Sequence, residues 1–160
     1  MKVKIRFMTR EDKPAIMAIL NNTPEFKPAE VVVAEELLDS YLHDPNGWGY
    51  YILVAEAEEK VAGYICYGPT LLTEGTWDIY WIAVAAEKQN QGVGCALMAS
   101  AEANIGRAKG RLVLVETSSK PNYEKTRRFY QKLGYEVVSR IPDFYEPGDD
   151  KITLQKLSPR

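Results

Sequence analysis

The sequence predicts one α/β (α+β) domain, in which about four helices flank a mixed, mostly antiparallel sheet of about seven strands. Two observations predict this class. Stretches typical of strands are interspersed with stretches whose apolar residues recur at helical spacing. The central strand-like stretches follow each other through short turns, which favours hairpins, whereas helices separate the later ones. The chain of 160 residues shows no internal repeat and no long linker, so residues 1–160 are expected to form a single domain.

The N-terminal third is expected to contain one strand and two helices. Residues 3–7 alternate charged and apolar side chains, which predicts a strand. Thr9 stands three residues before Asp12, a spacing typical of a helix cap, and a helix is predicted to follow to about residue 20. Proline is favoured in a first helical turn, so a second helix is predicted from Pro28 to about residue 43.

The middle of the chain predicts three strands. Residues 51–55 and 61–67 are apolar and aromatic, and the charged triplet 58–60 between them predicts a tight turn. Residues 76–84 are rich in aromatic and β-branched side chains, which favour a strand. Because the connections are short, an antiparallel arrangement of the three is the simplest expectation.

The last third is expected to alternate helices with strands. A helix is predicted from residue 93 to about 108, a short buried strand at 112–115, and an amphipathic helix at 121–133. Two closing strands are predicted at 136–138 and 152–154, on either side of an irregular segment at 142–150.

Composition and charge exclude several classes of function. A net charge of −2 gives no electrostatic reason to expect nucleic acid or an anionic membrane as the main partner. Cys66 and Cys95 are too few for the disulfide framework of a small secreted domain, and the N-terminus has no apolar signal core. A cytoplasmic location is therefore expected. One histidine and two distant cysteines predict no metal site.

A glycine-rich loop separates the strand at 76–84 from the helix at 93–108. Glycines let the backbone approach a bulky anion, and the first turn of a helix offers unpaired N–H groups and the positive end of its dipole. The loop is therefore a candidate pyrophosphate cradle. It lacks the third glycine of a dinucleotide-binding loop and the Lys-Ser/Thr ending of a P-loop. Its residues are Gln89, Asn90, Gln91, Gly92, Val93, Gly94 and Cys95.

Two blocks of sequence resemble a known family. The loop and the Ile-Ala-Val before it resemble the acetyl-CoA signature Arg/Gln-x-x-Gly-x-Gly/Ala of the Gcn5-related N-acetyltransferase (GNAT) superfamily. A second block, Phe-Tyr-Gln-Lys-Leu-Gly-Tyr at 129–135, and the order of the predicted elements extend the resemblance over almost the whole chain. The resemblance implies acetyl-CoA as cosubstrate and an amine as acceptor, attacked directly. It is also compatible with a homodimer.

The resemblance assigns cofactor contacts to several residues. The backbone from Gln91 to Cys95 would hold the pyrophosphate, and Ile82, Ala83 and Val84 would pair with the pantetheine arm. In the family, this strand and the strand at 112–115 splay apart around the thioester.

Two further cofactor contacts are less clearly assigned. Arg127 belongs to a basic group that would meet the 3′-phosphate, although a solvated basic helix face explains that group equally well. Many family members carry a cofactor-contacting asparagine at the position of Tyr123. Here Asn122 stands one residue earlier, so its role is open. The other members of the basic group are Lys120, Lys125 and Arg128.

Tyr130 is the leading candidate for the general acid. A tyrosine hydroxyl with a pKa of about 10 stays protonated at neutral pH and can protonate the departing sulfur. The family places a tyrosine in this role at the matching position. The alternative is that Tyr130 only packs beside Phe129.

The general base has two candidates, with a carboxylate-held water as a further agent. Glu116 ends the apolar run at 112–115, where partial burial would raise its pKa toward the working range. Asp78 begins the other splayed strand, and alternation predicts that its side chain shares a face with Tyr80 and Ile82. Either acid has a structural strand-end role as its alternative, and for Asp78 that alternative is the stronger.

The acceptor side is expected to combine aromatic and acidic residues, which suit a cationic amine. Most of the aromatics are expected to pack in the core or at its rim, and residues 143–150 are expected to form a shaped loop near the site. A covalent route through Cys95 is disfavoured, because that residue lies in the cradle. A non-catalytic coenzyme A-binding or sensor domain, or transfer of another acyl group, stays open. The residues are Phe26, Tyr41, Trp48, Trp77, Tyr80, Trp81, Phe144 and Tyr145, with Glu74, Asp143, Glu146, Asp149 and Asp150.

Overall fold

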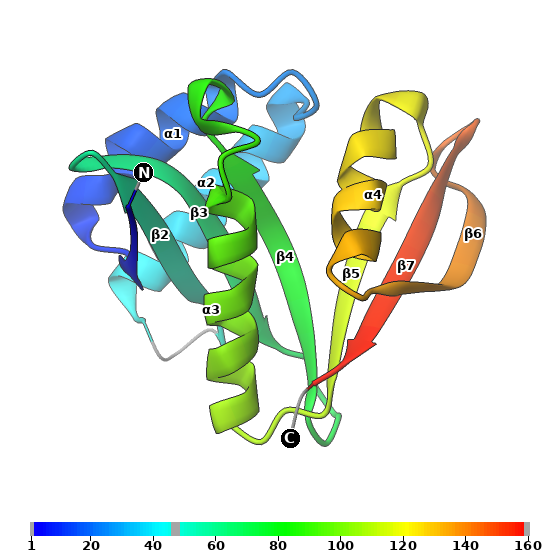
Figure 1. Cartoon of the computed structure of the whole chain (residues 1–160). Coiled ribbons are helices and arrows are strands. Elements are labelled where there is room, and N and C mark those ends of the chain that lie inside the picture. The colour runs from blue at the N-terminus through cyan, green and yellow to red at the C-terminus, as the bar shows by residue number, and fades with distance from the viewer. Residues whose placement is uncertain (1, 46–48, 159–160) are drawn as a thin grey trace.

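A computed structural model describes residues 2–45 and 49–158. They form a seven-stranded sheet in the order β1-β2-β3-β4-β5-β7-β6, with helices on both faces (Figure 1). The predicted α/β class, with its mixed and mostly antiparallel sheet, is confirmed. The strands are β1 (Val3–Phe7), β2 (Tyr51–Ala57), β3 (Lys60–Pro69), β4 (Thr76–Val84), β5 (Leu112–Ser118), β6 (Glu136–Glu146) and β7 (Asp149–Leu157). The helices are α1 (Lys13–Asn21), α2 (Pro28–His43), α3 (Val93–Arg107) and α4 (Glu124–Lys132), with the 3-10 turns η1 (Arg10–Asp12), η2 (Ala86–Lys88) and η3 (Pro121–Tyr123).

The first half of the sheet is antiparallel. The turn between β2 and β3 places Glu58 and Glu59 at φ values of 54° and 63°, the left-handed conformation that tight hairpins require. Helices α1 and α2 cover one face of β2 to β4, as Figure 1 shows behind the sheet. Ile16, Leu20 and Leu38 from these helices are at most 1% exposed and form a core cluster with the strands beneath them.

Helix α3 connects β4 to β5, and these two strands run parallel, because a helical crossover returns the chain to the same end of the sheet. Helices α3 and α4 cover the face opposite α1 and α2 (Figure 1). Leu97 of α3, Tyr130 of α4 and Leu154 of β7 belong to one core cluster, which spans both halves of the sheet.

The structure corrects the prediction for the closing strands. Residues 142–150, expected to be irregular, extend β6 and β7 into one long hairpin that turns at Pro147 and Gly148. Pro142 is tolerated within β6 because β6 is the edge strand, where one row of N–H groups has no neighbour to bond. Gly148 has a φ of 84°, which supplies the reversal of the chain.

Strands β4 and β5 pair only where they begin. Their register joins residues 76–79 to residues 112–115 and ends there, although β4 continues to Val84 and β5 to Ser118. In Figure 1 the two strands meet at one end and diverge toward the other, where α3 and α4 begin. We call the part of the sheet where residues 80–84 and residues 116–118 do not pair with each other the opening. The splay that the family resemblance implies is therefore present.

Candidate active site

The free edge of β4 offers backbone groups to the opening. Ala85 donates its N–H to the carbonyl oxygen of Ala62 in β3 at 2.8 Å, and the direction of hydrogen bonding alternates along a strand. The N–H and C=O groups of Ile82 and Val84 therefore face away from β3, while those of Ala83 face toward it. An extended chain lying in the opening can pair with Ile82 and Val84, which is the contact predicted for the pantetheine arm.

A β-bulge lies in β4 beside the opening. The register with β3 shifts so that Tyr80 is an extra residue on the β4 side. The bulge makes one prediction wrong: Asp78 and Tyr80 do not share a face with Ile82. Ile82 packs against the core under α3 and α4, whereas Trp81 packs against the core under α1 and α2. Simple alternation fails here because the extra residue reverses the side-chain direction after it.

The loop before α3 has the shape expected of an anion cradle. Asn90 and Gly92 have φ values of 63° and 84°, so the chain turns sharply into the helix. Helix α3 begins at Val93 without a side-chain cap, and the N–H groups of Val93, Gly94 and Cys95 have no hydrogen-bond partner among the residues described. A Cβ on Gly92 would meet nothing within 4 Å, so the space beside this turn is open. Free N–H groups beside open space fit a pyrophosphate.

Three side chains of the loop are occupied by the protein itself. Gln89 donates through Nε2 to the carbonyl oxygen of Val84 at 3.3 Å, and Gln91 donates through Nε2 to that of Glu87 at 3.1 Å. The Val93 side chain is 1% exposed and belongs to the core. The groups that remain for a ligand are therefore mainly backbone groups, as the sequence predicts.

Gly94 of α3 lies against α4, where the two helices come close together. A Cβ on Gly94 would stand 3.1 Å from Cζ and 3.3 Å from Cε1 of Phe129. The missing side chain therefore lets the N-terminus of α3 come close to α4. This packing reason stands beside the predicted ligand contact. The neighbouring Cys95 is exposed.

Tyr130 lies on α4 with its side chain 5% exposed. The rings of Phe129 and Tyr135 pack edge-on against it, with centroids at 5.3 and 5.9 Å. Burial raises the pKa of Tyr130 above its ordinary value, so the hydroxyl keeps its proton at neutral pH. Within residues 2–45 and 49–158 no group hydrogen-bonds to this hydroxyl, which leaves its proton available for donation.

Glu116 is more exposed than predicted. Its side chain is 51% exposed, so the expected partial burial is wrong. Val115 and Thr117 are buried on the α4 side, which directs Glu116 to the other face, and α1 and α2 cover β2 to β4 rather than this part of β5. The ammonium of Lys151 lies 3.6 Å from the Glu116 carboxylate.

Asp78 lies on the same face of the sheet as Glu116, at the narrow end of the opening. Its register partner is Leu114, two residues before Glu116, so both acids point away from α3 and α4. Thr70 donates through Oγ1 to Asp78 Oδ2 at 2.6 Å. Burial and the nearby Asp78 raise the pKa of Tyr80 to about 12. The bond to Thr70 gives the Asp78 carboxylate a structural partner, and which of the two acids acts as the base stays a prediction.

Arg127 braces the connection between β5 and α4. Its Nη1 donates to the carbonyl oxygens of Ser118 at 2.7 Å and Lys120 at 2.9 Å. Asn122 is exposed on η3 in the same connection. Cofactor contacts of Arg127 and Asn122 stay predictions, and the bonds of Arg127 already explain its presence.

Sequence reasoning missed a second brace of this connection. Ser118 donates through Oγ to the carboxylate of Asp149, which is 4% exposed, and accepts the N–H of Lys120 at 3.0 Å. Ser119 donates its N–H to the carbonyl oxygen of Asp150 at 3.0 Å. These residues are far apart in the sequence, and no local pattern links them.

The aromatic residues predicted for the acceptor side divide into groups. Phe26 packs on Trp81 with ring centroids 6.0 Å apart, and Phe144 and Tyr145 are half-exposed on β6. Trp48 lies outside the described residues. Two other aromatics of the set are core residues, as expected for most of them: Tyr41 and Trp77.

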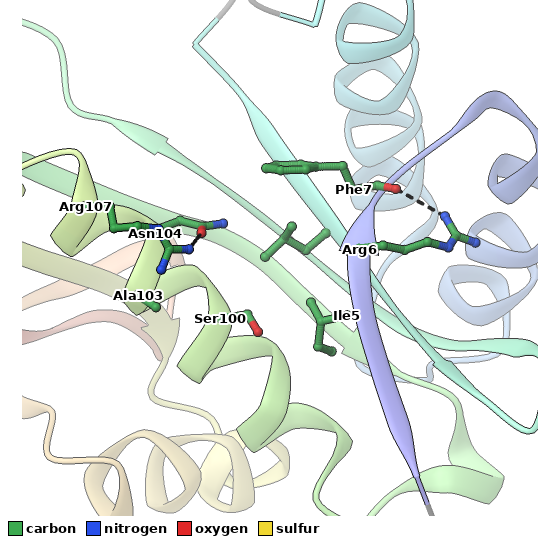
Figure 2. Close-up of a pocket in the computed structure, with 8 residues that line it drawn as sticks. Ile5, Arg6, Phe7, Ser100, Ala103, Asn104 and Arg107 are labelled. Carbon is green, nitrogen blue, oxygen red and sulfur yellow. Dashed lines mark hydrogen bonds between the residues drawn. The ribbon is translucent and has the colours of Figure 1, made fainter.

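A pocket of about 380 Å³ lies away from the opening, between β1 and the C-terminal half of α3 (Figure 2). Asn104 on its wall stands about 16 Å along α3 from the cradle, at 1.5 Å per residue. The described ranges contain no cluster of side chains that would hold a metal ion. In the same ranges, no helix has both the length and the apolar character needed to cross a membrane.

Comparison with known proteins gives a consistent result. A family model described as an acetyltransferase (GNAT) domain matches residues 48–137. An uncharacterized N-acetyltransferase of Methanocaldococcus jannaschii is 31% identical over 118 residues, which cover 70% of this chain and 71% of that protein. A crystal structure from Desulfovibrio desulfuricans, assigned to the GNAT family, matches with a TM-score of 0.95 and 38% identity, covering 99% and 100% of the two chains. A structure of an acetyltransferase from Salmonella typhimurium with its cofactor acetyl-CoA matches with a TM-score of 0.79 and 20% identity, covering 100% and 96%.

Proposed function

Because this chain belongs to the GNAT family of acetyltransferases, we propose that it transfers the acetyl group of acetyl-CoA to a primary amine by direct attack. We treat residues 1–160 as one such domain. The observation that carries the proposal is the opening between β4 and β5, which has a protonated tyrosine on one face of the sheet and carboxylates on the other.

The backbone around the opening fits the cosubstrate. The free groups of Ile82 and Val84 suit the amides of an extended pantetheine arm, and the uncapped first turn of α3 suits the pyrophosphate. The space beside Gly92 leaves room for the phosphates. The Salmonella acetyltransferase of the same fold was solved with acetyl-CoA, which supports this use of the opening.

The proton from the acceptor is taken up on one face of the sheet, and the proton for the departing sulfur is donated from the other. The acceptor ammonium loses a proton to Glu116 or Asp78, directly or through water, and the free amine nitrogen attacks the thioester carbonyl carbon. The C–N bond forms as the C–S bond breaks, and the nitrogen releases its second proton to water as the amide forms. Tyr130 on the other face donates its proton to the departing sulfur, which leaves as the thiol. The raised pKa of Tyr130 means that the hydroxyl carries its proton before each turnover.

Thiol release from acetyl-CoA, measured with amino acids, polyamines, aminoglycosides and peptides, tests the proposal. We expect turnover with at least one primary amine and a loss of kcat in Glu116→Gln that exceeds the loss in Asp78→Asn. Gly92→Val is expected to abolish acetyl-CoA binding while the protein stays folded. Tight acetyl-CoA binding without thiol release for any acceptor would instead support a non-catalytic coenzyme A-binding domain.

A further inference from the structure

Three segments meet across the wide end of the opening, where no sheet hydrogen bonds join the two halves of the molecule. The connection between α1 and α2 belongs to the first half, and the β5–α4 connection and the β6–β7 hairpin belong to the second. Tyr123 of the β5–α4 connection donates through its hydroxyl to the carbonyl oxygen of Glu25 at 2.9 Å. This bond ties the α1–α2 connection to the second half.

Glu146 joins all three segments. It is the last residue of β6, and its carboxylate accepts from the ammonium of Lys120 and, at 3.5 Å, from that of Lys27, which precedes α2. We call these three residues the clasp. The pKa of Glu146 is lowered by Lys120 first and Lys27 second, so its carboxylate is ionised throughout the neutral range. Lys120 was a candidate for the 3′-phosphate, and its ammonium is engaged here instead.

The clasp borders the face on which the acceptor must approach. Tyr145, next to Glu146 in β6, has its pKa raised to about 12 by burial first and then by Glu116 and Asp149. The ammonium of Lys151 lies 3.6 Å from the Glu116 carboxylate and 4.2 Å from the ring centroid of Phe144, so Glu116 lies close to the segment that carries Glu146. Lys27 is the residue before α2, and this helix covers β2 on that same face. The clasp consequently spans the entrance that leads to the candidate base.

We propose that Glu146 is a positioning residue that sets the width of the acceptor entrance by holding the α1–α2 connection against the β6–β7 hairpin. This inference rests on the proposed acetyl transfer. Glu146 takes no part in bond making. A closed clasp favours a slender, unbranched amine, because a bulky acceptor needs the α1–α2 connection to move away.

The size of the effect follows from the exposure of the clasp. The side chains of Lys27, Lys120 and Glu146 are 56%, 35% and 41% exposed, so water and salt weaken both ion pairs. Exposed pairs of this kind shift an equilibrium by roughly two- to tenfold together. The expected change in acceptor selectivity is therefore about fivefold, and it belongs in KM rather than in kcat.

The experiment compares Glu146→Gln with Glu136→Gln, a matched change on β6 whose carboxylate makes no ion pair within the described part of the chain. Putrescine serves as the slender acceptor and kanamycin as the bulky one. In Glu146→Gln we expect the ratio of kcat/KM for putrescine over kanamycin to fall about fivefold through KM, with acetyl-CoA affinity unchanged. Glu136→Gln should match the wild type, and Glu146→Asp should recover part of the ratio.

A second measurement keeps the inference testable without turnover. Amide hydrogen exchange of residues 22–27 is expected to be several-fold faster in Glu146→Gln than in Glu136→Gln, and about 0.5 M salt should produce the same acceleration in the wild type. Unchanged exchange in this segment, or equal selectivity in the two variants, overturns the role of Glu146. If the wild type releases no thiol with any amine but exchange is still faster in Glu146→Gln, the proposed function is wrong and the structural role of the clasp is supported.

Discussion

The contact between Gly94 and Phe129 gives a prediction that can be worked out from the structure. Gly94→Ala adds a Cβ that stands 3.1 Å from Cζ of Phe129, shorter than the roughly 3.5–4.0 Å of a relaxed carbon–carbon contact. Gly94 lies in the first turn of α3 without a positive φ, so alanine is compatible with the backbone there. The whole unfavourable effect therefore comes from the approach of α3 to α4.

Two opposing contributions set the magnitude. Replacing glycine by alanine within a helix gains about 0.5–1 kcal/mol of stability, whereas overpacking of this kind costs about 1–3 kcal/mol. The expected net loss is about 0.5–2 kcal/mol. Phe129→Leu removes the two ring atoms that clash, so the double variant should be about 1 kcal/mol more stable than the sum of the single changes.

Urea unfolding and titration calorimetry with acetyl-CoA measure both consequences. Gly94→Ala is expected to weaken acetyl-CoA binding by about tenfold, or 1.4 kcal/mol, because the first turn of α3 shifts away from α4. Phe129→Leu should restore most of that affinity. Gly92→Ala is the control: its φ of 84° strains any side chain, but no neighbour lies within 4 Å, so Phe129→Leu should not rescue it. Additive effects of Gly94→Ala and Phe129→Leu would refute the steric explanation.

Three further predictions concern single side chains. Tyr130→Phe should lower kcat by about 10²-fold. The affinity for acetyl-CoA and the melting temperature should stay nearly unchanged, because the lost hydroxyl has no hydrogen-bond partner within the described residues. A kcat within threefold of the wild-type value contradicts the role of Tyr130 as the acid. Asp12 accepts from Arg6 at 2.7 Å, and this bond lowers its pKa. The ion pair stabilises the protein above about pH 4, and this stabilisation is lost as the pH falls through the pKa of Asp12 in the folded protein. In Asp12→Asn, the midpoint of urea unfolding should therefore change less between about pH 2 and pH 6 than it does in the wild type. An equal change in the two proteins contradicts this. Arg127→Gln should lower the free energy of unfolding in urea by about 1–3 kcal/mol, because the carbonyl oxygen of Ser118 loses its donor. An unchanged free energy of unfolding contradicts the proposed role of Arg127 in stabilising the β5–α4 connection.

Much of the fold could be predicted because the sequence carries local signals for it. Pro28 marks the start of α2, and Gly92 marks the sharp entry into α3, since each residue type suits the backbone geometry at its position. The order of strands and helices, and the positions of Tyr130 and the cradle, follow from such signals combined with the two family-like blocks. The resemblance also supplied the splay of β4 and β5, which no local pattern predicts.

The remaining features depend on contacts that only the folded chain creates. The bulge at Tyr80 leaves no trace in composition, so alternation gave the wrong face for Ile82. The length of the β6–β7 hairpin was missed because Pro142 and Gly148 both indicate a turn by local rules. Only Gly148 lies in the turn, since an edge strand such as β6 tolerates a proline within it. The exposure of Glu116 depends on which strands α1 and α2 cover, and that is a property of the tertiary packing.

The opening between β4 and β5 gives the sheet two additional unpaired edges in its interior. A free strand edge is usually an aggregation hazard, because it offers a row of backbone groups to the strand of any other chain. Here the two edges face one another, and α3 and α4 begin beside them, so these backbone groups do not lie at an outer edge of the sheet. A molecule that pairs with both edges has to lie between β4 and β5, within the sheet. The divergence that keeps these edges away from the rim of the sheet is therefore also what, under the proposed function, favours an extended cosubstrate.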